Sequence, residues 1–391
     1  MTEPQQLRPG FRALYGDEPR VFRAPGRVNI IGEHVDYNDG MVMPAAIDLS
    51  TWVAVSPRND RKLVVRSQDL EGVVELNLDL QRPKAAGDWS DYVYGVALEI
   101  DRLGQRLPGA NVVVASEVPI GAGLSSSAAL EVASALAFAD LADIELSPEE
   151  TARLCLRAES EFVGARCGIM DQFIACFGRP DQAIVLDCRD LSFRFVSLPS
   201  TVRLVLANTM VRHDLTAGKY NKRRAECEQA LERLKRGRPD IESLRDVTAE
   251  AVEAASDVLT RTQLRRCRHV TSENQRVLEA EKALAEDDPA TLGRILSAAH
   301  ASLRDDYEVS CRELDLMAEL AERTPGVFGA RMMGGGFGGC VIALVEAGEA
   351  EAFAGRVGRR YKEEMDVDAW FHVCTLSGAA EAVDPVPASV S

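Results

Sequence analysis

The chain has 391 residues, of which 46% are apolar and 27% are charged, and its formal net charge is −16. A chain of this length exceeds one average hydrophobic core and fits two domains that share an interface. The acidic balance disfavours nucleic acids and anionic membranes as partners, because both carry negative charge. We therefore expect small molecules as partners.

Two short basic runs, at residues 219–224 and 265–269, lie in stretches with helical periodicity, so we expect solvated helix faces there. The nine cysteines include no C-x-x-C pair, which predicts reduced and mostly buried thiols rather than a zinc or redox site. The start of the chain is polar, and no run of about eighteen apolar residues occurs. These features predict a cytoplasmic protein.

The first half of the chain mixes predicted strands with a few helices. β-Branched and apolar residues predict strands at 28–31, 51–56, 62–66, 73–76, 111–115, 183–187 and 193–198. Helical patterns predict helices at 91–103, 124–141 and 148–162, and serines stand where the second of these begins. A twisted sheet with helices is therefore expected.

The second half begins with a predicted strand at 202–208 and continues as long helical patterns between 220 and 320. Strand composition returns at 341–345 and 370–374, on either side of a predicted helix at 349–364. The change in composition near residue 200 predicts an N-terminal domain at 10–198, a C-terminal α+β domain at 199–379 and a flexible tail at 380–391.

Residues 26–37 read Gly-Arg-Val-Asn-Ile-Ile-Gly-Glu-His-Val-Asp-Tyr, a short strand followed by a turn crowded with polar groups. Glu33, His34 and Asp36 offer the acceptors and switchable donors needed to hold several hydroxyls of one sugar. The alternative is a turn whose polar side chains bond only to their own backbone.

Residues 119–128 read Pro-Ile-Gly-Ala-Gly-Leu-Ser-Ser-Ser-Ala and lead into a predicted helix. The amides and partial positive charge of a helix N-terminus suit a phosphate, and the serine hydroxyls can reach phosphate or magnesium. The Walker A pattern and its lysine are absent. The alternative is a glycine turn with a serine cap.

Residues 334–339 read Gly-Gly-Gly-Phe-Gly-Gly and formally contain the dinucleotide fingerprint G-x-G-x-x-G. That fingerprint requires a strand before it and a helix after it, whereas residues 340–345 have strand character. We therefore predict a glycine hairpin that lets two backbones pack closely around a ligand.

Asp171 lies in the apolar run Cys167-Gly168-Ile169-Met170-Asp171-Gln172-Phe173, and Glu159 precedes it. A carboxylate in apolar surroundings needs a cationic or hydrogen-bonding partner, and such places often hold catalytic acids and bases. The alternative is a helix cap or a turn aspartate.

Taken together, these residues resemble the galactokinases, a family within the GHMP superfamily of small-molecule kinases. The resemblance runs from about residue 20 to residue 375 and rests on the motifs at 26–37, 119–128 and 332–339, in this order and spacing. It implies an α+β, two-domain GHMP kinase fold, with a mixed sheet and helices in the N-terminal domain and the active site in the cleft between the domains.

The resemblance also implies a monomeric enzyme that transfers the γ-phosphate of ATP to the C1 hydroxyl of galactose, the first committed step of galactose catabolism. Asp171 would accept the hydroxyl proton, and Arg27 would pair with Asp171 and counter the charge on the transferring group. Magnesium would bind at Ser127 and Glu159. The implied sugar contacts are Glu33, His34, Val35, Asp36, Gly168, Asp171 and Tyr220, and the implied ATP phosphate loop is Gly121, Ala122, Gly123, Leu124, Ser125, Ser126 and Ser127.

Three positions depart from the family pattern: Ala122 replaces a frequent glycine, and Val35 and Met333 replace common threonines. Pocket changes of this size alter selectivity modestly. A kinase for a related sugar, such as N-acetylgalactosamine or arabinose, therefore remains an alternative. A galactose-sensing regulator without catalysis is another, although the serine run, Arg27 and Asp171 favour an enzyme. A purely structural origin would explain each motif alone, but not their occurrence together.

Overall fold

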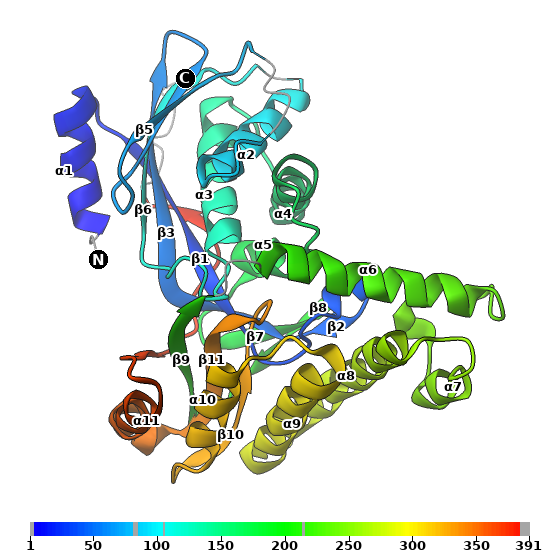
Figure 1. The fold of residues 1–391 in the computed structure, drawn as a ribbon. Helices are drawn as coiled ribbons and strands as arrows, with labels where there is room; N and C mark the ends of the chain where they lie inside the picture. The colour runs from blue at the N-terminus through cyan, green and yellow to red at the C-terminus, as the bar shows by residue number, and fades with distance from the viewer. Residues whose placement is uncertain (1–3, 81–84, 105, 213–215, 384–391) are drawn as a thin grey trace.

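The computed structural model describes residues 4–80, 85–104, 106–212 and 216–383 (Figure 1). A six-stranded sheet forms the upper half in Figure 1, and only its β4–β6 pair is parallel. The strand order is β13 (Glu381–Ala382), β1 (Arg20–Asn29), β3 (Pro44–Arg58), β6 (Gly109–Ser116), β4 (Lys62–Ser67) and β5 (Val73–Asn77).

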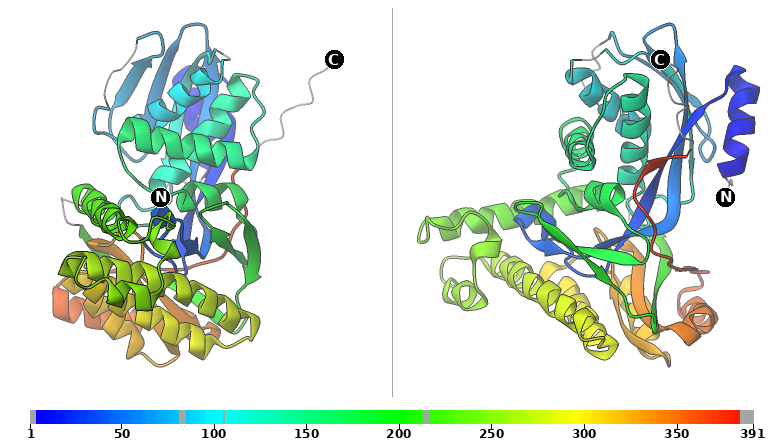
Figure 2. Two further views of the ribbon diagram at one scale, coloured as in Figure 1. Left: turned by 90° about the vertical axis from the view of Figure 1, so that its right-hand side faces the viewer. Right: turned by 180° about the vertical axis from the view of Figure 1, so that it is seen from behind.

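Helices cover both faces of this sheet (Figure 2). α1 (Pro4–Tyr15) lies on one face, where Leu7 and Phe11 pack with Trp52 and Val113. The other face carries α2 (Ser90–Arg102), α3 (Ser126–Leu141) and α4 (Pro148–Arg157), and a short helix, α5 (Met170–Phe177), follows them in the chain. α3 is rich in alanine, and its small side chains allow close packing on β1 and β3.

The lower half contains an antiparallel sheet in the order β10 (Val327–Met332), β11 (Gly338–Glu346), β9 (Val202–Arg212) and β12 (Trp370–Val373). Alternate side chains of β9 enter two cores. Val205 and Ala207 join the core that includes α10 (Arg312–Glu322) and α11 (Ala350–Met365), whereas Leu204 and Leu206 join one that includes α8 (Arg261–Ala285) and α9 (Pro289–Ser302). A small sheet of β2 (Met41–Val42), β7 (Gln182–Asp187) and β8 (Phe193–Ser197), and the helices α6 (Thr216–Lys235) and α7 (Ala249–Ala254), complete the fold.

β1 connects the two halves and positions the site. Phe22 and Ala24 lie in the core of the upper half, while Val28 and Ile30 lie in the core that α8 and α9 share. The register of β1 against β3 shifts between Pro25 and Arg27, which is where the strand passes from one half to the other. The end of β1 therefore delivers the polar turn at residues 32–37 to the junction of the halves.

Most of the predicted elements are present, with longer strands than expected at β1, β3 and β9. The glycine run is confirmed as the connection of an antiparallel hairpin between β10 and β11. The sequence did not predict α1, β2, β10 or α5, and the end of the predicted helix at 148–162 is a π-helical turn, Ala158–Val163. The predicted boundary near residue 199 falls between β8 and β9, and the division into two domains there stays a prediction.

The predicted flexible tail is wrong at its beginning. β13 pairs with β1, and Ala380 N–H donates to the carbonyl of Ala175 in α5 at 2.8 Å. Backbone pairing thus ties this segment to the upper half although its side chains are small. The prediction for residues 384–391 lies outside the described residues.

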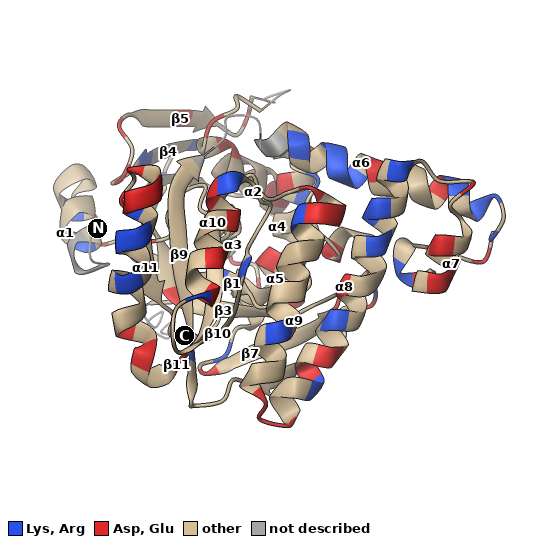
Figure 3. Cartoon of the chain, turned by 60° about the horizontal axis from the view of Figure 1, so that its bottom comes forward, with Lys and Arg blue, Asp and Glu red and all other residues tan. Residues whose placement is uncertain are grey.

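The predicted solvated basic faces are also wrong in part. Figure 3 shows both signs of charge interspersed on the outer helices. However, Arg266 is 1% exposed and binds Glu226 and Glu308, and Arg223 donates to the carbonyls of Tyr307 and Glu308. These arginines join α6 and α8 to the turn after α9, so their charge is satisfied inside the protein.

All nine cysteines are free, as predicted, and five of them are buried. Within the described residues, no helix combines the length and apolar character that crossing a membrane requires.

Two glycines let α9 lie directly against β10. A Cβ atom at Gly329 would lie 2.1 Å from the carbonyl oxygen of Gly293, and one at Gly293 would lie 2.1 Å from the carbonyl oxygen of Phe328. We expect Gly329→Ala to lower the free energy of unfolding by about 2 kcal/mol, because the backbones must move apart. Urea unfolding measures this loss.

Gly355→Ala is the matched control, since Gly355 lies inside α11 with no atom within 4 Å of the added methyl group. It should raise stability by about 0.5–1 kcal/mol, as alanine is the better helix former. Equal effects of the two changes would contradict the packing explanation.

Candidate active site

The loop before α3 has the conformation expected of an anion-binding helix start. Ser125 precedes the helix at φ 60°, and its hydroxyl does not cap the helix but donates to Asp171 Oδ2 at 2.5 Å. A serine in the left-handed region costs about 1 kcal/mol, and such conformations gather at functional sites. The amides at the start of α3 are therefore left for another acceptor.

Arg27 and Asp171 form a bidentate ion pair at the end of this loop. Arg27 Nε donates to Asp171 Oδ1 and Arg27 Nη2 donates to Asp171 Oδ2, both at 2.8 Å, and Arg27 Nη1 donates to the carbonyl of Gly123 at 2.5 Å. Arg27 is 5% exposed. Asp171 lies in the first turn of α5, so β1, α5 and the phosphate loop meet at one carboxylate.

The polar turn after β1 holds a buried histidine with an unsatisfied ring nitrogen. His34 adopts φ 63°, its Nδ1 bonds with the hydroxyl of Tyr37 at 2.8 Å, and its Nε2 is buried without a partner. Burial lowers the pKa of His34 to about 3, so the ring is neutral. The rings of Tyr220 and Tyr307 lie 5.4 and 4.8 Å away. An orphaned nitrogen here suits a ligand hydroxyl.

Asp36 lies directly against Gly168, in the segment that leads to Asp171. A Cβ atom at Gly168 would lie 2.2 Å from Asp36 Oδ2, so glycine is required by the close approach. Burial and the charge of Asp171 raise the pKa of Asp36 to about 7. A ligand that donates hydrogen bonds to Asp36 would stabilise the ionised form of this carboxylate.

A cavity of about 580 Å³ lies beside these groups, within the usual size of a small-molecule site. Its lining includes Arg27, Asp171, Tyr220 and the loop residues Gly121, Gly123, Leu124, Ser125, Ser126 and Ser127. Glu33, His34 and Asp36 are not part of the lining but adjoin it through Tyr220 and Asp171. The side chains of Val35 and Ala122 are buried in the cores, so a ligand would meet only their backbone.

Several large apolar side chains also line the cavity and were not predicted as site residues. They include Leu70, Trp89, Tyr92 and Ile120. Ile120 is 46% exposed and Leu70 is 37% exposed, which is high for apolar side chains beside a cavity. Ile120 stands in the motif at 119–128, but Leu70, Trp89 and Tyr92 lie in no motif, because aromatic and aliphatic side chains give no signal of a site before the fold assembles them.

Glu159 lies in a carboxylate cluster behind Ser127. Its Oε2 accepts from Gln172 Nε2 at 2.6 Å and from Cys167 at 3.2 Å, and it bonds with Ser127. Gln172 also donates to Glu131, whose other oxygen is buried without a partner. Burial raises the pKa of Glu159. Among the described residues, no group of three or more His, Cys, Asp and Glu side chains forms a metal site.

The hairpin motif packs behind the phosphate loop. A Cβ atom at Gly334, which adopts φ 76°, would lie 3.0 Å from Gly123 Cα. The ring of Tyr220 lies 3.4 Å from the position of a Cβ at Gly335. The close packing predicted from the glycines is therefore present, and it places the hairpin between the phosphate loop and the polar turn.

The raised pKa of Asp36 predicts a stability effect. Its pKa is about 7 in the folded protein and about 4 in the unfolded chain, so its contribution to stability is lost as the pH rises from 4 to 7. We expect Asp36→Asn to raise Tm by about 3 °C or more at pH 8 and to leave Tm almost unchanged at pH 4.

Thermal unfolding of both proteins from pH 4 to 8 measures the difference. A Tm difference that stays constant over this range would contradict the assignment of the shift to Asp36. Loss of sugar binding in the same variant would show that Asp36 lowers the stability of the protein but is needed to bind the sugar.

Three family profiles match the chain: the galactokinase galactose-binding signature at residues 10–57, the N-terminal domain of GHMP kinases at 91–179 and the C-terminal domain of GHMP kinases at 280–363. A galactokinase from Roseiflexus sp. (strain RS-1) is 44% identical over 387 residues, which cover 98% of each chain. The crystal structure of Lactococcus lactis galactokinase complexed with galactose is 38% identical, with a TM-score of 0.93, and covers 98% of this chain and 100% of that chain.

A mevalonate kinase crystal structure shares the fold at 19% identity and a TM-score of 0.65, covering 92% of this chain and 99% of that chain. The two-domain architecture and the matched profiles thus define a GHMP kinase, a small-molecule kinase with mixed sheets and helices. Within that class, the chain belongs to the galactokinase family, and it is an ATP-dependent sugar kinase. The predictions of fold class, family and enzyme class are confirmed.

Proposed function

We propose that this protein transfers the γ-phosphoryl group of ATP to the C1 hydroxyl of α-D-galactose and releases galactose 1-phosphate and ADP. The observation that supports it most is the bidentate pair of Arg27 and Asp171, which lies between the phosphate loop and the polar turn. The near relatives named above are galactokinases, and one of them was crystallised with galactose.

The proposed reaction needs few groups. Asp171 accepts the proton of the C1 hydroxyl while that oxygen forms a bond to the γ-phosphorus and the bond from phosphorus to the oxygen of ADP breaks. Arg27 orients Asp171 and faces the charge that spreads over the transferring group. The free amides before α3 and the hydroxyls of Ser126 and Ser127 receive the phosphates.

The residues that line the cavity suit the two parts of ATP. Trp89 and Tyr92 offer aromatic surface for the base, and the loop at residues 121–127 offers amides for the phosphates. The polar turn with Glu33, His34 and Asp36 then holds the sugar from the side that Tyr220 and Gly168 complete. In this arrangement His34 Nε2 and the carboxylate of Asp36 bond with sugar hydroxyls.

The side chains of Ser127 and Glu159, which the sugar and the phosphates do not fully use, suit a magnesium ion. Ser127 and Glu159 supply a hydroxyl and a carboxylate oxygen, which are ligands that Mg²⁺ prefers, and Mg²⁺ commonly takes one or two protein ligands with substrate phosphates. A cation would also relieve the unfavourable burial that raises the pKa of Glu159. When bound, Mg²⁺ would neutralise charge on the separating phosphates. Gln172 and Cys167 hold Glu159 in place beside Ser127.

A coupled ADP-release assay with ATP and Mg²⁺ tests the proposal on galactose, N-acetylgalactosamine, arabinose and glucose. We expect turnover on galactose well above that on the other sugars. Faster turnover on another sugar would reassign the substrate, and galactose binding without turnover would indicate a regulator. That the chain acts as a monomer in the cytoplasm stays a prediction.

A further inference from the structure

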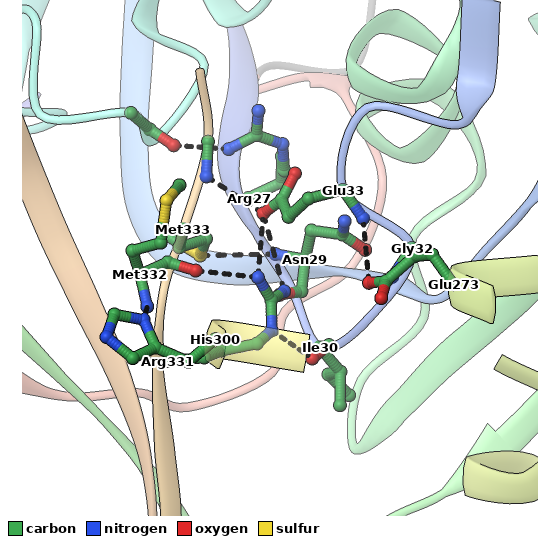
Figure 4. A network of polar contacts seen from close by, with 12 residues as sticks. Arg27, Asn29, Ile30, Gly32, Glu33, Glu273, His300, Arg331, Met332 and Met333 are labelled. Carbon is green, nitrogen blue, oxygen red and sulfur yellow. Dashed lines mark hydrogen bonds and ion pairs between the residues drawn. The ribbon is translucent and has the colours of Figure 1, made fainter. Parts of the chain in front are cut away.

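Arg331, at the end of β10, is fully buried and contacts the polar turn from behind (Figure 4). Its Nε donates to the carbonyl of Ile30 at 2.8 Å, and its Nη2 donates to the carbonyl of Asn29. Both Nη atoms also bond with Glu33 Oε1, at 3.2 and 3.3 Å, and Nη1 donates to the carbonyl of Met332 at 2.7 Å. One guanidinium thus joins the end of β1 to the glycine hairpin.

Glu273, in the middle of α8, holds the same turn through its backbone. Its Oε1 accepts from the amide of Gly32 at 3.0 Å and from that of Glu33 at 3.3 Å, and its Oε2 accepts from Arg276 Nε at 2.6 Å. Burial would raise the pKa of Glu273, but the positive charges of Arg276 and Arg331 and the hydrogen bond from Arg276 help to lower the pKa to about 2. The carboxylate therefore stays ionised and fully buried.

Glu33 is the point where these contacts meet. Its Oε1 accepts from Arg331 and also from the amide of Gly334 at 2.8 Å, and the Glu33 carbonyl bonds with His269 Nε2 at 3.0 Å. The next residue, His34, carries the unpartnered ring nitrogen. The turn is thus bonded on its inner side to α8 and β10, while its outer side faces the site.

Buried ion pairs of this kind contribute little stability that apolar side chains could not supply, since desolvation offsets their attraction. They do fix geometry, because each bond has a direction. Neither Arg331 nor Glu273 lines the cavity, and neither bonds with Arg27 or Asp171. Their effect on the reaction must therefore pass through the turn.

We propose that Glu273 and Arg331 are positioning residues for the sugar, which hold residues 32–34 in the binding conformation before the sugar arrives. The inference rests on the proposed function, since it takes the turn as the sugar site. A turn that is already ordered does not lose conformational freedom on binding. Loosening it therefore weakens sugar binding and leaves ATP binding unchanged.

Glu273→Leu and Glu273→Gln separate this role from a merely structural one. Leucine removes both acceptors, and we expect KM for galactose to rise about tenfold while KM for ATP changes less than about twofold. Glutamine keeps an acceptor oxygen for the two amides, so KM for galactose should stay within about threefold of the unmodified enzyme.

Glu99→Leu is the control, because Glu99 is also a buried carboxylate, 4% exposed, and pairs with Arg102 and Arg157 in the upper half rather than with the polar turn. It should lower Tm less than Glu273→Leu does, because Arg102 and Arg157 are exposed, and it should change neither KM. A folded Glu273→Leu enzyme with unchanged KM for galactose, or with both KM values raised together, would overturn the proposal. If Glu273→Leu does not fold, Arg331→Lys replaces it, since lysine cannot reach Ile30, Asn29 and Glu33 at once.

Amide hydrogen exchange on the unmodified protein tests directly whether the turn is ordered before the sugar binds. We expect the amides of Gly32 and Glu33 to be protected without sugar and to gain almost no protection when galactose is added. Amides that exchange freely until galactose binds would overturn the proposal. If the proposed function itself is wrong, the outcome is different again: the unmodified protein would neither bind galactose nor turn it over.

Discussion

Replacing Asp171 with asparagine is expected to lower kcat by at least about a hundredfold, the usual effect of losing a general base. Asparagine has nearly the same shape, and its amide oxygen can still accept from Arg27, but its NH2 group cannot accept from the second Arg27 nitrogen or from Ser125 as the carboxylate does. It cannot accept the proton of a sugar hydroxyl. KM for ATP should change little, because the phosphate loop keeps its conformation.

The matched control for Asp171→Asn is Asp288→Asn, which makes the same change at the start of α9, where Asp288 caps the helix by accepting from the amide of Thr291. It should reduce stability slightly and leave kcat unchanged. Near-normal turnover in a folded Asp171→Asn enzyme would refute the base assignment. Because the charge of Asp171 helps to raise the pKa of Asp36, the variant should also lower that pKa.

The parts of the site that could be predicted from sequence are those whose residues are close in the chain. A helix was predicted to begin at the serines before the alanine-rich segment, and it does begin at Ser126, although the Ser125 hydroxyl does not cap it. Residues 334–339 must form a close turn because only glycine tolerates such contact, and the hairpin is present. The helix-forming tendency of alanine decides the first feature, and the backbone freedom of glycine decides the second.

The parts that escaped prediction depend on contacts between distant segments. Arg331 lies in no motif and in no element predicted from the sequence, yet it is fully buried against residues about 300 positions earlier. Arg266 and Arg223 lie in runs that local periodicity assigns to solvent. In the structure, however, carboxylates and carbonyls of other elements accept their hydrogen bonds. A charge pattern reports only that a charge exists, and its partner is set by the tertiary fold.

The same limit applies to the fine structure of the site. The π-helical turn at Ala158–Val163, which carries Glu159, has no signal in propensity, because α- and π-turns use the same residues. Val35 was predicted as a sugar contact by position, but its side chain is fully buried in the core. A motif therefore locates a loop in the site, while the backbone decides which of its side chains face the ligand.

Arg27→Met is expected to lower kcat by about a hundredfold or more, because the change removes a charge that faces the developing transition state. Arg27→Lys should restore only a small part of the rate. A lysine keeps the charge but cannot bond with both oxygens of Asp171 and with the carbonyl of Gly123, as the guanidinium does. Steady-state kinetics with galactose and ATP measure both variants.

Arg61→Met provides the matched control, since Arg61 also binds a carboxylate through two nitrogens, at 3.1 Å each to Asp101, and donates to the carbonyl of Leu107. It should affect stability and not kcat. The double variant Arg27→Met with Asp171→Asn should be no slower than the slower single variant, because groups that act as a unit lose their effects together. Rate losses that multiply would instead show that Arg27 acts on the phosphoryl group independently of Asp171.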